Sequence, residues 1–174
     1  MAGKPGRPRS LTVDQIVQAT LDDGLTSFSM PSVARRVGVA HSALYRYVDN
    51  REALLVTAVD HALGDVDWPP ADRPWKDVLR TVSATAWAAC DRTAGLDRAS
   101  LDSVGAMQAW DRHVASHTAA LQDQGFKPQD AGTVMGLIVR VTLISSAERN
   151  QTPDERTRDA RLDIVLTGAA GLRG

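Results

Sequence analysis

The sequence predicts an all-α protein in which a small N-terminal helix-turn-helix unit is followed by a larger helical part. Residues 28–55 spell two short helices, a glycine-centred turn and the start of a further helix. Apolar residues recur at helical spacing through most of the remaining chain, and no stretch alternates apolar and polar residues over the length of a strand. These observations together favour helices throughout.

The first helix is expected to begin at Thr12 and to stop at Gly24. The hydroxyl of Thr12 can cap it while Gln15 reaches back, and Leu11 can pack against Ile16. Its inward positions follow helical spacing: Val13, Ile16, Val17, Thr20 and Leu21. This helix is therefore predicted to be a scaffold for the two that follow.

The helix-turn-helix itself is expected from about 29 to 48. Ser29 can cap the first of its helices, which tolerates Pro31 in its first turn and runs to about Val37. Gly38 can take the positive φ of the turn, and the second helix spans about 41–48. Ala34 allows the close crossing, and a small shared core is expected from Val33, Val37, Val39 and Leu44.

The rest of the chain divides at its proline and glycine residues. Asp49 and Glu52 resemble a capping box that opens a helix running to Leu63. A proline-rich break, 68–74, precedes an inward-facing helix marked by Trp75, Leu79, Val82, Ala86 and Cys90. One short and three longer helices then follow, divided at Gly95, Gly105, Gly125 with Pro128, and Pro153. We expect a flexible basic arm (1–10), a helix-turn-helix domain with a linking helix (11–66) and a second helical domain (67–174).

Composition and charge bound the functions that are open to this chain. The formal net charge is −1, but residues 1–51 carry +3 and the remainder −4, so only the first part suits a polyanion. No run approaches the roughly 20 apolar residues of a membrane span, and the N-terminus lacks the apolar core of a signal peptide. We therefore expect a cytoplasmic protein with no membrane partner.

Recognisable catalytic patterns are missing from the sequence. It has no phosphate loop, nucleophile elbow, zinc-protease helix or dinucleotide fingerprint, so no catalytic residue and no cofactor are predicted. Cys90 is the single cysteine, which excludes a disulfide framework and a cysteine-zinc site within one chain. It is expected to be a small buried apolar residue.

The N-terminal stretch Lys4-Pro-Gly-Arg-Pro-Arg9 is basic and too rich in proline and glycine to fold alone. Such arms reach into the minor groove beside a helix in the major groove, so Lys4, Arg7 and Arg9 are candidate DNA contacts. The alternative is an ordinary frayed terminus.

Residues 28–55, with Leu44-Tyr-Arg-Tyr-Val48 followed by Asn50-Arg-Glu-Ala-Leu-Leu55, resemble the tetracycline-repressor (TetR) family. The resemblance covers about the first third of the chain, and beyond Trp68 only the helical plan is similar. It implies an N-terminal DNA-binding domain and a C-terminal effector-binding and dimerisation domain. The function that follows is a homodimeric repressor, released from a palindromic DNA operator by a small-molecule effector.

The resemblance also implies DNA contacts at particular positions. His41, Ser42, Ala43 and Tyr45 would face bases and nearby phosphates, Tyr47 and Arg51 would anchor phosphates, and Ser29 and Met30 would touch the DNA backbone. Tyrosine hydroxyls and arginine are suitable phosphate donors, and small residues permit close approach to base edges. Ala40 departs from the Ser or Thr of many members and removes a cap. Arg35 and Arg36 are either phosphate contacts or a solvated face.

The second domain offers candidates for an effector pocket. Met107, Trp110, Val114, His117 and Leu121 share one helical stripe, so His117 is either a satisfied core histidine or a polar group in a pocket. His113 lies four residues before His117, but no carboxylate pattern accompanies the pair, so no metal site is predicted. The candidate effector contacts are Trp87, Cys90, Met107, Trp110, His113, His117 and Met135.

The last two helices are expected over about 131–149 and 155–172. Within them, residues 131–147 are apolar on most sides and residues 162–172 are rich in Leu, Ile, Val, Ala and Gly. They are either core helices or two contributions to a four-helix interface of a homodimer. Two functions besides repression stay open: a TetR-like activator, and a helical interaction protein whose helix-turn-helix docks another protein.

Overall fold

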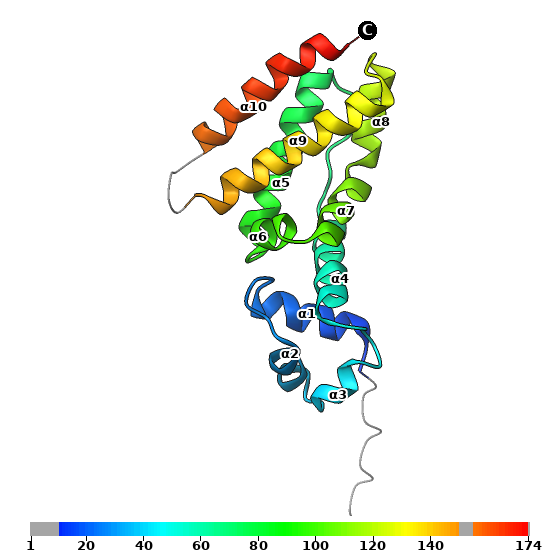
Figure 1. Ribbon diagram of the computed structural model, residues 1–174, viewed down its shortest axis with the longest axis vertical. Coiled ribbons are helices and arrows are strands. Elements are labelled where there is room, and N and C mark those ends of the chain that lie inside the picture. Colours follow the sequence, from blue (N-terminus) through cyan, green and yellow to red (C-terminus); the bar gives the residue numbers. More distant parts are fainter. Residues whose placement is uncertain (1–10, 150–154, 174) are drawn as a thin grey trace, which may run out of the picture.

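A computed structural model of the chain describes residues 11–149 and 155–173. Its regular elements are helices, and the described residues add one isolated β-bridge between Phe126 and Arg173. The molecule is elongated: three short helices form a head at one end, six helices form a body at the other, and α4 joins them (Figure 1). The predicted basic arm, with Lys4, Arg7 and Arg9, lies outside the described residues.

The head consists of α1 (Val13–Asp23), α2 (Met30–Val37) and α3 (His41–Leu44). Its first two helices begin with the predicted caps: Thr12 and Gln15 form a capping box, and Ser29 forms another with Ser32. Gly24 and Gly38 follow the helix ends with φ of 84° and 75°. These local signals confirm the predicted starts and stops of α1 and α2.

The recognition helix α3 is shorter than expected. The sequence predicted a helix over 41–48, but α3 ends at Leu44 and residues 45–47 form a turn. The amide of Arg46 donates to the carbonyl of Ala43 at 3.3 Å, and the amide of Tyr47 donates to the carbonyl of Leu44 at 2.9 Å. Each of these hydrogen bonds joins residues three positions apart, as in a 3₁₀-helix. Such bonds tighten the last turn beyond the α-helical pitch.

The connecting helix α4 spans Arg51–Gly64. The predicted capping box of Asp49 and Glu52 is wrong, because the side chain of Asn50 accepts the Ala53 amide at 2.8 Å instead. Glu52 is left free to turn toward the body. Further along α4, the buried side chains are Leu54, Leu55, Ala58, Val59 and Leu63, so this helix belongs to the core of both parts.

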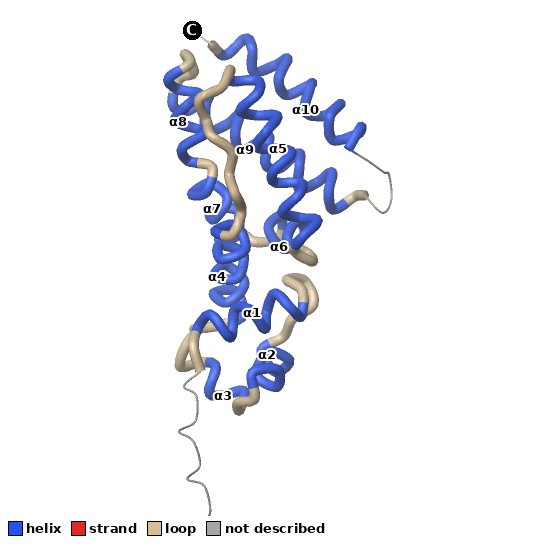
Figure 2. The backbone as a smooth tube through the Cα atoms, turned by 180° about the vertical axis from the view of Figure 1, so that it is seen from behind, coloured by secondary structure: helices blue, strands red, loops and turns tan. Residues whose placement is uncertain are grey.

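The body follows a long strap, residues 65–74, that runs along α7 and α8 before α5 begins (Figure 2). Three hydrogen bonds hold the strap: Trp68 Nε1 donates to Leu63 O at 3.2 Å, His117 Nε2 lies 2.7 Å from Pro69 O, and Gln124 Nε2 donates to Arg73 O at 2.9 Å. The body elements are α5 Trp75–Arg92, α6 Leu96–Leu101, α7 Val104–His113, α8 Ala115–Asp123, α9 Pro128–Ala147, α10 Glu155–Ala169 and the 3₁₀ turn Ala170–Leu172.

The helix expected after Gly105 is broken in two. Gly105 lies inside α7, which begins one residue earlier under a cap by Ser103, and Val114 separates α7 from α8. With φ −96° and ψ 9°, Val114 has left the helical region, and no side chain caps the start of α8. The predicted stripe survives this break, because Trp110, Val114 and His117 are all buried.

Helix α9 is long and apolar enough, by length and composition alone, to cross a membrane. It is the exception to the expectation that no such run exists. Half of its apolar window is buried inside the structure, where α9 packs against α5, α6, α8 and α10. We therefore interpret α9 as the central core helix of the body, whose apolar residues are used against neighbouring helices.

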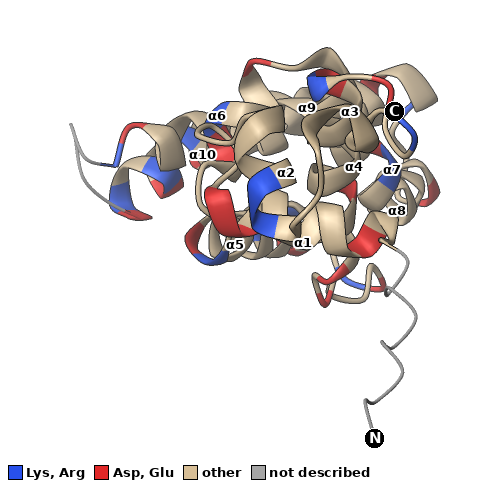
Figure 3. Cartoon of the chain, turned by 90° about the horizontal axis from the view of Figure 1, so that it is seen from below, with Lys and Arg blue, Asp and Glu red and all other residues tan. Residues whose placement is uncertain are grey.

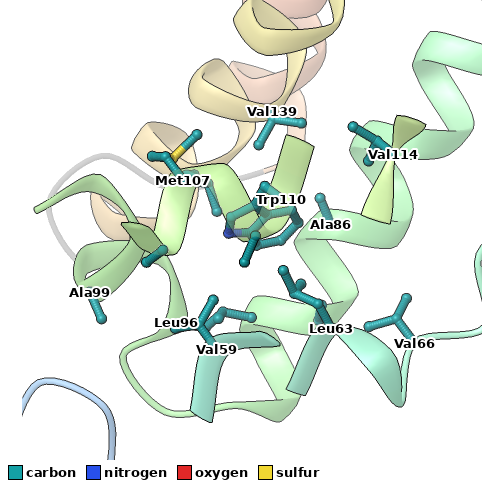
Figure 4. Close-up of a cluster of buried hydrophobic side chains, with 14 of the residues drawn as sticks. Val59, Leu63, Val66, Ala86, Leu96, Ala99, Met107, Trp110, Val114 and Val139 are labelled. Atoms are coloured by element: carbon teal, nitrogen blue, oxygen red, sulfur yellow. The ribbon is translucent and has the colours of Figure 1, made fainter. Parts of the chain in front are cut away.

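One continuous apolar core runs from the head through α4 into the body. In the body it surrounds the indole of Trp110, which is fully buried among side chains from α4, α5, α6, α7 and α9 (Figure 4). The indole N–H donates to the hydroxyl of Ser100 at 2.9 Å, and that hydroxyl donates to Leu96 O at 2.6 Å. Every polar atom of this buried pair therefore has a partner.

Candidate nucleic-acid interface

The start of α2 forms one edge of the candidate interface. Ser29 is exposed, but its side chain is occupied, since it accepts the Ser32 amide at 3.1 Å while Ser32 Oγ accepts the Ser29 amide at 2.9 Å. Met30, which was predicted to touch the DNA backbone, has only 6% of its side chain exposed. Its thioether belongs to the core, so a contact from this position would come from the main-chain amide at the helix start.

The tip of the head presents α3 and the turn after it. His41, Ser42, Tyr45 and Tyr47 are exposed, Ala43 is half-buried, and Leu44 anchors the segment in the core. Tyr45 and Tyr47 expose 49% and 38% of their surface. Neither tyrosine is therefore a core residue, because Leu44 and Val48 occupy the inward positions. Two phenol groups are left available to solvent or to a ligand.

His41 and Tyr45 lie against each other on this exposed face. Their rings are 5.3 Å apart between centroids and meet edge to face at 72°, and Tyr45 Oη lies 3.4 Å from His41 Nε2. The geometry is that of a weak hydrogen bond, which leaves donor and acceptor capacity on both rings. The start of α3 has no side-chain cap at Ala40, as the sequence indicated.

Arg51 lies at the first turn of α4 and is exposed. Its guanidinium carbon sits 4.3 Å from the centroid of the Phe28 ring, and its Nε donates to Phe28 O at 3.4 Å. The ring therefore fixes the direction of the side chain. The other N–H groups of Arg51 remain free to donate to a phosphate.

The two arginines of α2 differ in their surroundings. Arg36 is bound to Asp23, with Nη2 2.5 Å and Nε 2.7 Å from Oδ1, and Figure 3 shows basic residues on α2 beside acidic ones. A hydrogen bond from Ser32 and then the bond and charge of Arg36 lower the pKa of Asp23 below its ordinary value. Arg36 therefore fastens α2 to α1, whereas Arg35 is exposed and has no carboxylate within 4.0 Å among the described residues.

The predicted effector residues do not come together in one place. His113 Nε2 lies 3.3 Å from Asp60 Oδ1 on α4, whereas His117 Nε2 lies 2.7 Å from the strap carbonyl of Pro69. His117 is 2% exposed and is a satisfied core histidine. The two imidazoles thus serve different elements. Within residues 11–149 and 155–173, no group of three His, Cys, Asp or Glu side chains is placed to hold a metal ion.

The remaining candidates are divided between four positions. Met107 and Trp110 fill the core, and Met135 borders a cavity of about 330 Å³ between α7, α8 and α9. Trp87 lies between the guanidinium groups of Arg149 and Arg158, at 4.9 and 5.1 Å from its ring. Cys90 borders a separate cavity of about 410 Å³, and burial raises the pKa of its thiol to about 12.

The residues that fasten the head to the body were not predicted from the sequence. Ser103 caps α7 by accepting the Ala106 amide at 3.0 Å, and its hydroxyl donates to Glu52 Oε1 on α4 at 2.5 Å. On the other side of the joint, the Leu25 amide donates to the Ala94 carbonyl at 3.0 Å. A serine three residues before Ala106 could have been recognised as a cap, but its partner 51 residues away carries no local signal.

Helices α9 and α10 also leave some apolar side chains exposed. Leu137 and Ile144 on α9, Ile164 on α10 and Leu172 after it expose between 39% and 73% of their surface. These four residues form what we call the α9–α10 face. These residues lie on, or directly after, the two helices that the sequence marked as rich in apolar residues. An uncovered apolar surface of this kind is typical of an interface with another chain.

Comparison with known proteins shows which sequences and structures this chain resembles. The sequence model of the family described as bacterial regulatory proteins, tetR family, matches residues 13–58. The transcriptional regulator EthR of Mycobacterium tuberculosis is 24% identical to this chain, over 95% of this chain and 89% of its own length.

Solved structures share the same fold. ActR of Streptomyces coelicolor, in complex with (S)-DNPA, is 21% identical with a TM-score of 0.80, over 94% of this chain and 99% of its own. BioQ, solved with its double-stranded DNA operator, is 18% identical with a TM-score of 0.80, over 92% and 99% of the two chains. The all-α architecture with an N-terminal helix-turn-helix is thereby confirmed.

Proposed function

We propose that this chain, which belongs through residues 13–58 to the TetR family of bacterial regulatory proteins, is a ligand-responsive DNA-binding transcriptional repressor that acts as a homodimer. The observation that carries the proposal is the head itself. It is a helix-turn-helix in which α3 and the following turn present Tyr45 and Tyr47 to solvent while Leu44 holds them in place. We expect it to act in the cytoplasm, and no enzymatic reaction is part of the proposal.

The DNA-contact residues are proposed from their exposure and chemistry. His41, Ser42 and Ala43 would lie in the major groove with Tyr45, while Tyr47 and Arg51 would hold phosphates on either side. Arg51 is suited to this role because the Phe28 ring directs it and leaves donors free. Ser29 and the main-chain amide of Met30 would contact the DNA backbone, and Lys4, Arg7 and Arg9 the minor groove.

A homodimer is proposed because one short recognition helix contacts few base pairs. A two-fold pair places two such helices about 34 Å apart, on successive major grooves of a near-palindromic operator. The α9–α10 face, with Leu137, Ile144, Ile164 and Leu172, is the surface that a second copy would cover. BioQ bound to a double-stranded operator supports DNA as the partner of this fold.

An effector is proposed from the body and from its relatives. ActR is described with (S)-DNPA and, in another structure, with actinorhodin. In this chain the cavity of about 330 Å³ bordered by Val114, Thr118 and Met135 is large enough for part of a small molecule. The dimer would have two states, which differ in the distance between its two α3 helices, and only one of them would fit the operator. A small molecule releases the DNA only if it binds these two states with different affinity.

The decisive experiment is a footprint of the full chain on DNA upstream of its own and neighbouring genes, titrated against nonspecific competitor at several salt concentrations. We expect a protected two-fold site and a steep fall of affinity with salt, because phosphate contacts release counterions. Tyr45→Ala should need about tenfold more protein for the same protection, while keeping the fold. Absence of protection above competitor would contradict the proposal and favour an interaction protein; activation of a reporter would favour an activator.

The dimer interface can be tested separately. Ile164→Glu places a charge on the α9–α10 face and should convert the dimer to a monomer with much weaker operator binding. Val104→Glu is the matched control, because Val104 is 78% exposed but lies at the start of α7, outside that face. Light scattering after gel filtration gives the mass of each variant. A dimeric Ile164→Glu protein would place the interface elsewhere.

A further inference from the structure

The joint between head and body is narrow and is held by a few close contacts. Besides α4 itself, these are the 3.0 Å bond from the Leu25 amide to Ala94 O and the 2.5 Å bond from Ser103 Oγ to Glu52. Gly95 lies so close to Thr26 that an added Cβ would come within 2.8 Å of Thr26 Oγ1. Thr26 is therefore in direct contact with the body.

Two cavities lie on either side of this contact. One, of about 410 Å³, is bordered by Cys90, Asp97, Ser146 and Arg149; the other, of about 260 Å³, is bordered by Leu25, Arg51, Leu55 and Asp102. Thr26 and Arg98 border both cavities. We call the two together the joint crevice. A molecule in it would touch the head and the body at once.

The charged groups of the joint crevice differ in how far they are already used. Glu52 accepts the Ser103 hydroxyl, and Asp97 accepts the Ser146 hydroxyl at 2.7 Å. Arg149 is paired with Asp91. Arg98 is exposed, and its guanidinium group has no carboxylate oxygen within 4.0 Å among the described residues, although its main-chain amide donates to Asp97 at 2.7 Å; the guanidinium of Arg51 likewise has no carboxylate partner. The guanidinium group of Arg98 thus keeps all its donors and that of Arg51 all but Nε, while the carboxylate of Asp102 has no hydrogen-bond or ion-pair partner among the described residues.

We propose that the joint crevice binds a small organic acid. Its carboxylate would accept hydrogen bonds from Arg98 and the hydroxyl of Thr26, and its hydrocarbon part would lie against Leu25, Leu55 and Ala99. Arginine suits this role because its planar fork matches a carboxylate. The site is distinct from the cavity beside Met135, which shares none of these residues.

The regulatory consequence rests on the proposed function. Arg51 borders the crevice and is also the residue that we assign to a DNA phosphate. A carboxylate bound near Arg98 would compete with that phosphate for the Arg51 guanidinium. It would also press on Thr26, which belongs to the head. An acid in the crevice is therefore expected to weaken DNA binding.

The test uses the full chain and 1-naphthoate as the probe, with 1-naphthalenemethanol as its uncharged analogue, followed by isothermal titration calorimetry. We expect naphthoate to bind the unaltered protein and Arg98→Gln to lower its affinity about tenfold or more, since a charge-assisted bond is lost. Asp102→Asn should raise the affinity about two- to fivefold by removing a like charge. Arg92→Gln, on the opposite side of the joint, should change nothing.

Two results would overturn the proposal: equal binding of the acid and the alcohol, or naphthoate affinity that Arg98→Gln leaves unchanged. Undetectable naphthoate binding at millimolar concentration would overturn it as well. Because calorimetry uses protein without DNA, this outcome is independent of whether the chain binds an operator. Operator affinity of Arg98→Gln, measured without naphthoate, should match that of the unaltered protein.

Discussion

The head and the body each contain a histidine packed edge to face on an aromatic ring, and the two pairs differ in what they leave unused. His41 and Tyr45 lie on the exposed tip, 3.4 Å apart at their polar atoms. In the body, His117 lies 6.1 Å from the Trp68 ring and 2.7 Å from Pro69 O, and it is 2% exposed. The exposed pair keeps hydrogen-bonding capacity for a partner, whereas the histidine of the buried pair uses its ring nitrogen to bind the strap.

This difference extends to the neighbouring residues. In the body, buried polar groups such as Ser83 and Thr142, 2.7 Å apart, satisfy each other. At the tip of the molecule, Tyr47 in the head and Arg51 at the start of α4 present their polar ends to solvent. Variants in the body should therefore change stability, and variants at the tip should change binding. The following predictions test this division, beginning with the largest effect.

Trp110→Ala should lower the free energy of unfolding by about 3–5 kcal/mol, because a fully buried indole leaves a cavity and Ser100 loses its partner. Urea unfolding followed by circular dichroism measures the loss. Trp110→Phe, which keeps most of the volume, should cost much less. A loss below about 1 kcal/mol for the alanine variant would show that the body does not depend on this core.

Gly95→Ala should cost about 1–3 kcal/mol, because φ of +78° is a left-handed conformation and the new methyl would collide with Thr26. Since the collision lies at the joint, operator affinity should fall together with stability. Gly132→Ala is the matched control, because nothing lies within 4 Å of its added Cβ. If Gly95→Ala lowered stability alone, the joint would not position the head.

Tyr45→Ala should weaken operator binding about tenfold while changing unfolding by less than about 0.5 kcal/mol, because the side chain is 49% exposed. Tyr45→Phe removes only the hydroxyl and separates hydrogen bonding from ring packing. Binding is measured by gel shift, and stability by urea unfolding. A stability loss above 1 kcal/mol would instead assign Tyr45 to the fold.

The smallest effect concerns acid stability at the contact between α4 and α7. Burial raises the pKa of Asp60, but the bond and charge of Arg112, and then His113, outweigh it and place this pKa below its ordinary value of 3.8. Asp60 therefore stabilises the fold above pH 3.8, and the stabilisation is lost as the pH falls through the lowered pKa. Because Asp60 is half exposed, the contribution stays below about 1 kcal/mol.

Asp60→Asn should accordingly be slightly less stable than the unaltered protein at pH 6, and the difference should shrink toward zero on acidification. Urea unfolding at pH 6 and at pH 3 measures both values. A difference that stayed constant over this range would mean that the carboxylate charge is not what joins α4 to α7. Asp163→Asn, another surface partner of an arginine but on α10, serves as a control for general charge effects.

Local signals in the sequence were sufficient for α1 and α2, because caps act within three or four residues, but they did not predict that α3 ends at Leu44. Thr12 with Gln15, Ser29, and Gly38 all take their expected places. The break at Val114 was not predicted, because the apolar stripe continues through it and only packing against other helices decides the local geometry. The apolar stripe therefore predicts correctly that its residues are buried, but it predicts wrongly that they lie on one unbroken helix.

The candidate sites show the same limit. Tyr45 and Tyr47 were named from the family resemblance, and their exposure could be expected because Leu44 and Val48 occupy the inward positions beside them. The effector residues were chosen as polar or aromatic side chains on apolar faces, and those faces turn toward different neighbours: His113 toward α4 and His117 toward the strap. Contacts between residues about 50 positions apart, such as Glu52 with Ser103, depend on the tertiary fold alone.

The strap after α4 influences how far the head can move relative to the body. It is tied to Leu63 O by Trp68 and to α8 by His117, and these bonds hold the body end of α4. With 14 residues, α4 is about 21 Å long, so tilting it by about 5° around its body end would move its first turn by about 2 Å. In a two-fold dimer the α4 helices of both copies would tilt, which doubles the change in the distance between the two heads. Small rotations at the strap are thus amplified into displacements comparable to the hydrogen-bond lengths on which base reading depends.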